Sequence, residues 1–327
     1  TTNDKKKQQQ EESGGLSEDN TSAENHCTIF TVAESPLDEN MIWVGTDDGN
    51  LQMVTDGGKS WTNVAANYAA AGIPAQTWVS SIEPSRFDRN TVYATFDNHM
   101  YGDMNTYLAK STDMGKTWTR ITSPEFTGYA NKIKEDLVNK NLLFLGTERG
   151  LFASVDGGET WFRMKNHIPD YSMVRDIQIQ PQTNDLLIAT HGRGIMVIND
   201  ITPMRTLSKD IAAKDVVLFD NKPMPITTGK YGGGGSPVSG GWWGGNPDDI
   251  QPIEYYLKDR ATKDVKVDSY DATGKLVQSM PGTKRKGVNK VFWNQRLTPP
   301  KTADGCTRMV YGSFIAPLVL PDRYTVN

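Results

Sequence analysis

The sequence predicts an all-β protein, and three observations lead to that prediction. Short runs rich in β-branched and aromatic residues recur along the 327 residues, and their apolar residues alternate or run without interruption, as in strands. Clusters of Gly, Asn, Asp and Pro, which favour turns, separate these runs. One eight-residue turn pattern that ends in tryptophan occurs three times.

This turn pattern, which we call the octet, reads Ser/Thr-x-Asp-x-Gly-x-Thr/Ser-Trp. It fits residues 111–118 and 154–161, and it fits residues 54–61 with only the first position changed. The aspartate can accept hydrogen bonds from turn amides, and the glycine can supply a positive φ. The tryptophan begins the next strand and can pack against a neighbouring sheet. We therefore assign structural roles in the octets to Asp56, Gly58, Trp61, Asp113, Gly115, Trp118, Asp156, Gly158 and Trp161.

The residues around each octet repeat as well. A β-rich run ending in Thr precedes each octet, at 41–46, 91–95 and 142–147, and a fourth such run occurs at 186–190 without an octet. Strand-like runs that end at a proline lie further upstream, at 28–36, 78–84 and 174–181. One unit is thus four short strands, the pattern of a β-propeller blade. We predict four visible blades over residues 27–200.

The octets resemble the Asp-box, or BNR, repeat, and residues 189–200 resemble the terminal blade of bacterial sortilin-like proteins of the "glycosyl hydrolase" type. This resemblance implies a propeller fold and an extracytoplasmic location. Propellers of this family usually have more than four blades, so it also implies that further blades of a longer chain are partners of these four. Residues 1–26, a polar segment, would then be a tail or a loop between blades.

The C-terminal part of the sequence changes character. Residues 201–251 include a Gly-rich stretch at 229–249, which predicts a linker that packs on the propeller. Alternating strand patterns return over residues 252–327. They resemble the FlgD-type Ig-like module and imply a β-sandwich, which we expect to be truncated.

Composition limits the possible partners. The formal net charge is −4 and the sequence pI is about 5.7, so nucleic acid is not an expected partner. No apolar run is long enough to span a membrane, so we expect no direct membrane insertion. The two cysteines lie far apart, at positions 27 and 306, and no metal-binding spacing is present, so we expect no metal and no cofactor.

Candidate site residues lie in the loops of the propeller face opposite the octets. The hairpins between second and third strands carry charged and imidazole side chains, which also suit plain solvent-exposed turns. As ligand-binding candidates we select His191, Arg193, Arg149, Asp97 and His99. A glycan or a peptide is the expected ligand, because such mixed polar and aromatic loops can bind either one.

Three functions remain open from the sequence. The first is a non-catalytic module that binds a glycan or a peptide and acts as a scaffold. The second is a glycoside hydrolase, which needs two facing carboxylates; Asp47 or Asp48 with Glu148 is the pair that we nominate. The third is a structural subunit of a bacterial cell-envelope or secretion assembly.

Overall fold

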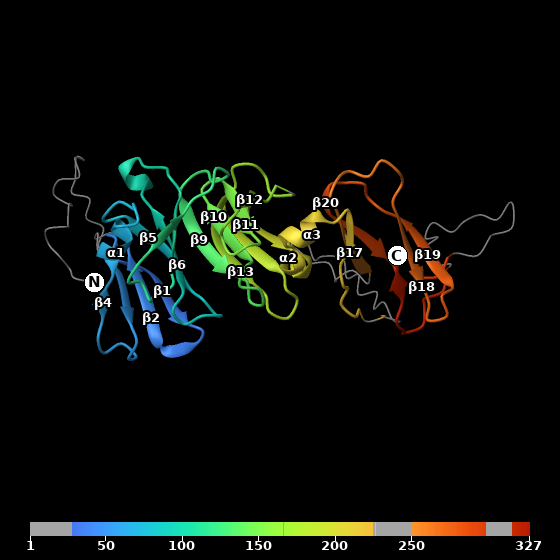
Figure 1. Ribbon diagram of the computed structural model, residues 1–327, viewed down its shortest axis with the longest axis horizontal. Coiled ribbons are helices and arrows are strands. Elements are labelled where there is room, and N and C mark those ends of the chain that lie inside the picture. The colour runs from blue at the N-terminus through green and yellow to red at the C-terminus, as the bar shows by residue number, and fades with distance from the viewer. Residues whose placement is uncertain (1–27, 166, 225, 227–249, 299–315) are drawn as a thin grey trace, which may run out of the picture. The chain divides into compact units, whose positions relative to one another are not determined.

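The computed structural model describes residues 28–165, 167–224, 226, 250–298 and 316–327 (Figure 1). It divides into two units, Thr1–Arg205 and Thr206–Asn327. The Gly-rich run at 229–249 and both cysteines lie outside the described residues. Each unit is described here by itself.

The first unit is a row of β-propeller blades, as the octets predict. Each blade is an antiparallel sheet whose strands pair in chain order, and the first strands of consecutive blades contact one another. Blades 1 and 2 comprise β1 (Ile29–Ser35), β2 (Asp38–Thr46), β3 (Leu51–Val54), β4 (Thr62–Asn63), β5 (Trp78–Pro84), β6 (Val92–Asp97), β7 (Tyr107–Ser111) and β8 (Thr119–Ile121). Blades 3 and 4 comprise β9 (Ala130–Glu135), β10 (Leu143–Thr147), β11 (Gly150–Ser154), β12 (Phe162–Arg163), β13 (Met173–Ile179), β14 (Leu186–His191) and β15 (Ile195–Ile198).

The fourth blade has three strands among the described residues, and β9 is a strand that the sequence analysis missed. Two short helices interrupt the pattern: α1 (Ala65–Ala69) lies between blades 1 and 2, and the 3₁₀ turn η2 (His99–Tyr101) follows β6.

The octets form the turns between the third and fourth strands of blades 1 to 3. In blade 2, Oδ1 of Asp113 accepts a hydrogen bond from the Thr117 amide at 2.8 Å, and Oδ2 accepts one from the Thr117 hydroxyl at 2.6 Å. These bonds hold the pKa of Asp113 below its usual value. Asp56 and Asp156 accept the corresponding bonds from Ser60 and Thr160. The octet glycines Gly58, Gly115 and Gly158 all have positive φ, as expected.

Each joint between neighbouring blades is a separate apolar core. We call the side of a blade that packs on the preceding blade its leading face, and the side that packs on the following blade its trailing face. At the first joint, Trp43 and Leu51 of blade 1 pack with Ile82 and Phe96 of blade 2. The next two joints repeat this pattern with Tyr93, Leu108, Ile133 and Phe152, and then with Phe144, Leu151, Ile177 and Ile188.

The octet tryptophans belong to these joints. Trp118 and Trp161 are 7% and 6% exposed, and each packs in the core between its own blade and the preceding one. Each indole N–H also donates to a glycine carbonyl of its own turn, Gly115 or Gly158, at 3.1 Å. Trp61 makes the same bond to Gly58 but is 43% exposed and lies outside these cores.

The second unit contains α3 (Lys209–Ala213) and two three-stranded antiparallel sheets that share one core. In the first sheet, β17 (Gln251–Leu257) pairs with β16 (Val216–Leu218) and β20 (Gly287–Trp293). In the second sheet, β18 (Lys266–Tyr270) pairs with β19 (Leu276–Pro281) and β21 (Thr325–Val326). Assignment of this unit to the Ig-like class stays a prediction from the sequence.

The predicted linker at 201–251 is not uniform. Arg205, in helix α2 (Thr202–Thr206), forms a bidentate ion pair with Asp136 of the first unit at 2.8 Å. Strand β16, by contrast, belongs to a sheet of the second unit. Among the described residues, no helix is long and apolar enough to span a membrane.

Candidate functional site

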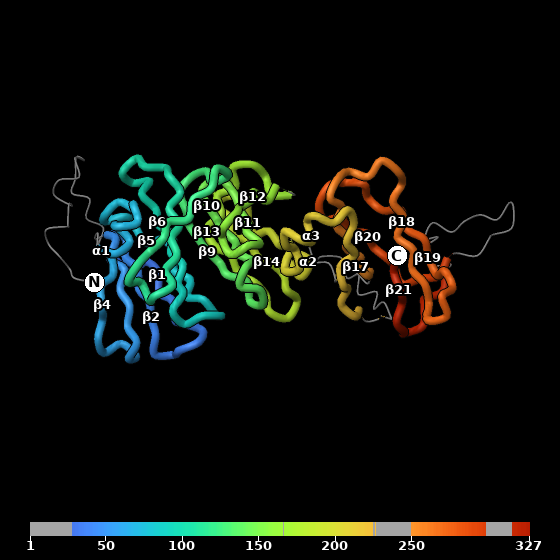
Figure 2. Tube along the Cα trace, in the orientation of Figure 1, coloured from blue at the N-terminus to red at the C-terminus, as the bar shows by residue number. Residues whose placement is uncertain are grey.

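The first strands of the four blades share an irregularity at the same position. Strands β1, β5, β9 and β13 each carry one extra residue relative to the strand they pair with, which is a β-bulge (their traces can be followed in Figure 2). The register places these bulges opposite equivalent residues of the second strands. The bulged residues are Phe30, Ser80, Asn131 and Arg175. Bulges re-aim side chains and are common beside functional sites.

All four bulged residues line one cavity of about 230 Å³, which we call the funnel pocket. Its remaining lining residues are Thr31, Trp78, Asp97, Lys132 and Asp176. The blades meet here through direct contacts: the Phe30 and Trp78 rings lie edge to face at 4.6 Å, the Ser80 hydroxyl donates to the Ala130 carbonyl at 2.8 Å, and Arg175 donates to Asn131 Oδ1 at 3.2 Å. The repeated bulge thus gathers side chains from four blades around one space.

The funnel pocket contains hydrogen-bond donors without acceptors. The indole Nε1 of Trp78 and the amide Nδ2 of Asn131 are buried and have no hydrogen-bond partner in the part of the chain that the structure describes. Leaving a buried donor unsatisfied costs about 1–3 kcal/mol. A ligand that supplies an acceptor to both groups recovers that free energy.

The funnel pocket is lined by two cations and two carboxylates, so its formal charges cancel, but not every charge is paired. Lys132 forms an ion pair with Asp176 at 3.2 Å. The carboxylate of Asp97 accepts hydrogen bonds from the backbone amide of His99 at 2.9 Å and from its ring Nδ1 at 2.7 Å. Arg175 has no carboxylate within ion-pair distance among the described residues, and its side chain is exposed to solvent. Arg175 is therefore the cation of the pocket that a ligand acceptor can pair with.

Two of the predicted ligand-binding residues meet at the edge of this pocket. Asp97 lines it, and His99, which Asp97 orients, stacks on Tyr129 with ring centroids 4.5 Å apart. Burial raises the pKa of Tyr129 above its usual value. The Glu148 amide of blade 3 donates to the Tyr129 carbonyl at 2.9 Å. Glu148 and its neighbour Arg149 therefore lie beside Asp97, His99 and Tyr129, and we call these five residues the rim.

Arg149 and Glu148 form an ion pair at 3.4 Å, and the Arg149 guanidinium lies 6.0 Å from the centre of the Tyr171 ring. His191 and Arg193 are exposed in the hairpin between β14 and β15. Neither of them lines the funnel pocket. The structure therefore joins Asp97, His99, Glu148 and Arg149 into one rim and leaves the two candidates of blade 4 at a hairpin tip.

The nominated carboxylates of blade 1 are engaged in their own hairpin. Asp48 is 1% exposed, and its carboxylate accepts hydrogen bonds from the Asn50 amide group at 2.8 and 3.0 Å and from the Thr46 hydroxyl. Asp47 accepts a bond from the Thr28 amide at 2.8 Å. Because its oxygens are buried and bonded, Asp48 acts as a structural residue of the turn.

Sequence reasoning missed most residues of the funnel pocket: Phe30, Thr31, Ser80, Asn131, Lys132, Arg175 and Asp176. A signal for them exists in the sequence. In three of the four first strands, two consecutive polar residues stand between apolar ones: Ser80-Ser81, Asn131-Lys132 and Arg175-Asp176. Such a pair breaks the two-residue period of a regular strand. Three such breaks at corresponding positions of a repeat predict aligned bulges.

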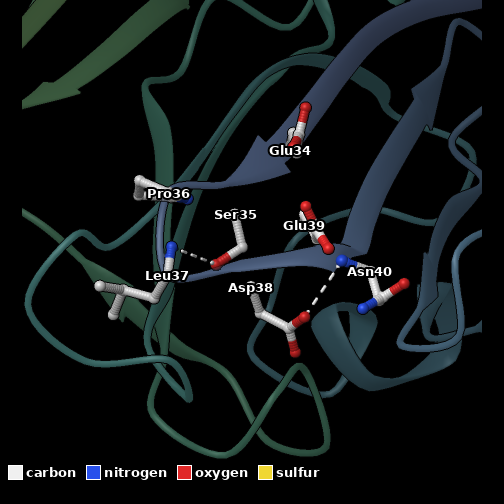
Figure 3. Close-up of a pocket in the computed structure, with 7 residues that line it drawn as sticks. All are labelled: Glu34, Ser35, Pro36, Leu37, Asp38, Glu39 and Asn40. Atoms are coloured by element: carbon white, nitrogen blue, oxygen red, sulfur yellow. Dashed lines mark hydrogen bonds between the residues drawn. The ribbon is translucent and has the colours of Figure 1, made fainter.

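A second, wider cavity lies in the hairpin between β1 and β2 (Figure 3). All of its lining residues come from that hairpin, at 34–40. Its most constrained carboxylate, Asp38, accepts hydrogen bonds from the Asn40 amide and from Arg89, and the Arg89 bond holds the pKa of Asp38 below its usual value. These contacts stabilise the hairpin, so we place the candidate site in the funnel pocket.

No family model and no curated protein matches the sequence. Among solved structures, the chain is similar to YCF48 from Cyanidioschyzon merolae, with 16% identity, a TM-score of 0.39 and 53% of each chain covered. It is also similar to the GH74 xyloglucanase from Xanthomonas campestris, with 12% identity, a TM-score of 0.44, and coverage of 86% of this chain and 39% of that one. The chain thus spans about half the length of the first structure and well under half of the second. The class of protein, a β-propeller, follows from the sheets and their register.

Proposed function

We propose that the first unit is an extracytoplasmic, Asp-box-type propeller module that binds a glycan or a peptide without catalysis of its own. The observation that supports this proposal is the set of donors in the funnel pocket. Trp78 Nε1 and Asn131 Nδ2 lack acceptors, and the Arg175 guanidinium lacks a carboxylate partner. A ligand with a carboxylate, either an acidic sugar or a peptide carboxyl terminus, would bring the acceptor oxygens that donors of this kind need.

The aromatic side chains of blades 1 and 2 supply the apolar part of such a site. Phe30 is 51% exposed and meets Trp78 edge to face, so one ring remains open to a sugar face or an apolar peptide side chain. The rim of Asp97, His99 and Tyr129 borders the same opening with polar groups. The combination of a few convergent polar groups and aromatic walls is typical of ligand pockets.

The hydrolase alternative has less support. Catalysis by a glycosidase needs two carboxyl groups about 5–9.5 Å apart across a sugar. Of the nominated acids, Asp48 is buried in hydrogen bonds of its own turn, and Glu148 is ion-paired with Arg149. We therefore favour binding over hydrolysis.

The proposal is tested by measuring binding of the chain to an array of glycans and peptides, in pairs that differ only in whether the carboxylate is free. We expect the full chain to bind ligands with a free carboxylate, such as uronic-acid glycans or peptides with free termini, and to prefer them to neutral glycans and amidated peptides. Arg175→Ala removes a charge-assisted hydrogen bond of about 1.5–3 kcal/mol, so the Kd should rise about ten- to a hundredfold.

Two arginine variants serve as comparisons for Arg175→Ala. Arg89→Ala removes an arginine that pairs with Asp38 in the loops beside the octets, and it should leave the Kd unchanged. Arg193→Ala tests the hairpin tip of blade 4. If Arg193→Ala loses binding and Arg175→Ala binds normally, the ligand site is not in the funnel pocket. If free and amidated ligands bind equally well, the carboxylate is not the group that the site recognises.

A further inference from the structure

The funnel pocket contains one cation and one carboxylate that do not pair with each other or with a second side chain of fixed charge. Lys132 and Asp176 form an ion pair, which leaves Arg175 and Asp97. Among the described residues, no carboxylate lies within ion-pair distance of Arg175, and no lysine or arginine lies within that distance of Asp97. The pocket therefore has an unmatched positive group on blade 4 and an unmatched negative group on blade 2.

The Asp97 carboxylate is buried but only partly bonded. Its side chain is 3% exposed, and the hydrogen bonds from the His99 amide and from His99 Nδ1 both reach Oδ1. Oδ2 accepts no hydrogen bond from the residues that the structure describes. A neutral imidazole can donate the Nδ1 bond, so this bond alone does not supply a cation. Because a buried charge is costly unless it is paired, a ligand cation at Asp97 would be favourable.

The surroundings of the two groups match their charges. Asp97 is the register partner of Trp78, whose ring meets that of Phe30 edge to face. Aromatic ring faces attract cations, so this side of the pocket favours an ammonium group. On the other side, Arg175 donates to Asn131 Oδ1, and Asn131 Nδ2 is a buried donor without an acceptor. That side favours a carboxylate.

The placement of the two groups limits the ligand. Strand β9 of blade 3 contacts both β6 and β13, so it lies between the strands that carry Asp97 and Arg175. Both residues nevertheless line one cavity of about 230 Å³, which is smaller than the ~300–1,000 Å³ typical of drug-sized ligands. The two ligand charges should therefore belong to one small molecule and be separated along it.

We propose that the funnel pocket binds a short unmodified peptide as a zwitterion, with its terminal ammonium at Asp97 and its terminal carboxylate at Arg175. This inference rests on the proposed function, which supplies the carboxylate contact, and it adds the ammonium contact. An acidic sugar brings no cation, and a free α-amino acid carries both charged groups on one carbon. A dipeptide separates the two groups, and each group can then form a charge-assisted hydrogen bond.

Isothermal titration calorimetry of the full chain with glycylglycine and N-acetylglycylglycine tests the inference, because the two peptides differ in the terminal ammonium. We expect both to bind and glycylglycine to bind about ten- to a hundredfold more tightly, the gain from a hydrogen bond to a charged group. Glycine should gain less over N-acetylglycine, because its ammonium lies too close to its carboxylate.

The possible failures of this experiment are distinct. Equal affinity for glycylglycine and its acetylated form would overturn the inference and leave the proposed function intact. Absence of binding by both peptides would overturn the proposed function as well. A gain for glycine as large as that for glycylglycine would overturn the short peptide and assign a free amino acid.

Three variants locate the ammonium. Asp97→Asn removes the charge but keeps an oxygen that can accept the His99 bonds, so it should bind both peptides equally and the acetylated one at least as tightly as the unchanged chain does. Arg175→Ala should weaken binding of both peptides by the same factor. Asp170→Asn is the matched control, because Asp170 pairs with Arg163 at 3.1 Å outside the pocket, and it should keep the preference. A preference for glycylglycine that persists in Asp97→Asn would overturn the inference.

Discussion

At the scale of single residues, position in the blade row decides what a repeated residue contributes. The three octet tryptophans have the same sequence context and the same indole hydrogen bond to a turn carbonyl. Only Trp118 and Trp161 fill a joint with a preceding blade, whereas Trp61 belongs to the first described blade and is 43% exposed. The octet identifies the turn and its aspartate, but burial of the tryptophan depends on the neighbouring sheet.

This difference predicts unequal costs of truncation. Trp118→Ala or Trp161→Ala leaves a cavity in a joint and should lower the free energy of unfolding by about 3–5 kcal/mol. Trp61→Ala in the same chain should cost well under half of that, because its side chain is 43% exposed and buries less apolar area. Denaturant unfolding of the three variants measures the effect. Equal losses in all three would contradict the packing of the joints.

At the scale of elements, the sequence could predict which strands form but only part of how they are aligned. The proline-ended runs, the Thr-ended runs and the octets predict most blade strands, because alternation and turn chemistry are local properties. Strand β9 was missed because no proline ends it. The aligned bulges were missed because a bulge exists only relative to the strand with which it pairs. The consecutive polar residues Ser80-Ser81 and Arg175-Asp176 are the signal of these bulges in the sequence.

The close approach of neighbouring blades gives a prediction at this scale. Gly45→Ala would place a methyl group 2.6 Å from Val79 Cγ1 and 2.7 Å from Thr31 Cγ2, and such overpacking should cost about 1–3 kcal/mol of stability. Val79→Ala removes the closest of these contacts, that of Cγ1, although its own Cβ remains 2.7 Å away. The double variant should therefore be more stable than the sum of the single effects predicts, by about 0.5 kcal/mol.

The matched control for this cycle combines Gly45→Ala with Ile177→Val, which lies at the third joint and does not contact Gly45. These two changes should add, because distant sites without shared partners are independent. Urea unfolding of each single and double variant gives the coupling. Additivity of Gly45→Ala with Val79→Ala would show that the two blades do not approach one another as described.

At the scale of the whole molecule, repetition explains both what the sequence could predict and what it could not. The octets predict the blades. They also predict that the hairpins between second and third strands lie on the face opposite the octets, because successive turns of a blade alternate between the two faces. Asp97, His99, Glu148 and Arg149 could therefore be selected as rim residues. Asn131 and Arg175 could not, because they face one another only after β9 and β13 of different blades are packed together.

The pocket between the four bulged strands is the central claim of this account, and the Trp78 indole reports on it directly. Trp78 Nε1 lacks an acceptor in the described chain, whereas the Trp118 and Trp161 indoles already donate to Gly115 and Gly158. The measurement is ¹H–¹⁵N NMR of the indole resonances during titration with N-acetylglycine, and with N-acetylglycinamide as the uncharged control. We predict a saturable shift of the Trp78 resonance with the carboxylate alone, while those of Trp118 and Trp161 stay in place. A stationary Trp78 resonance, or the same shift with the uncharged control, would contradict the claim.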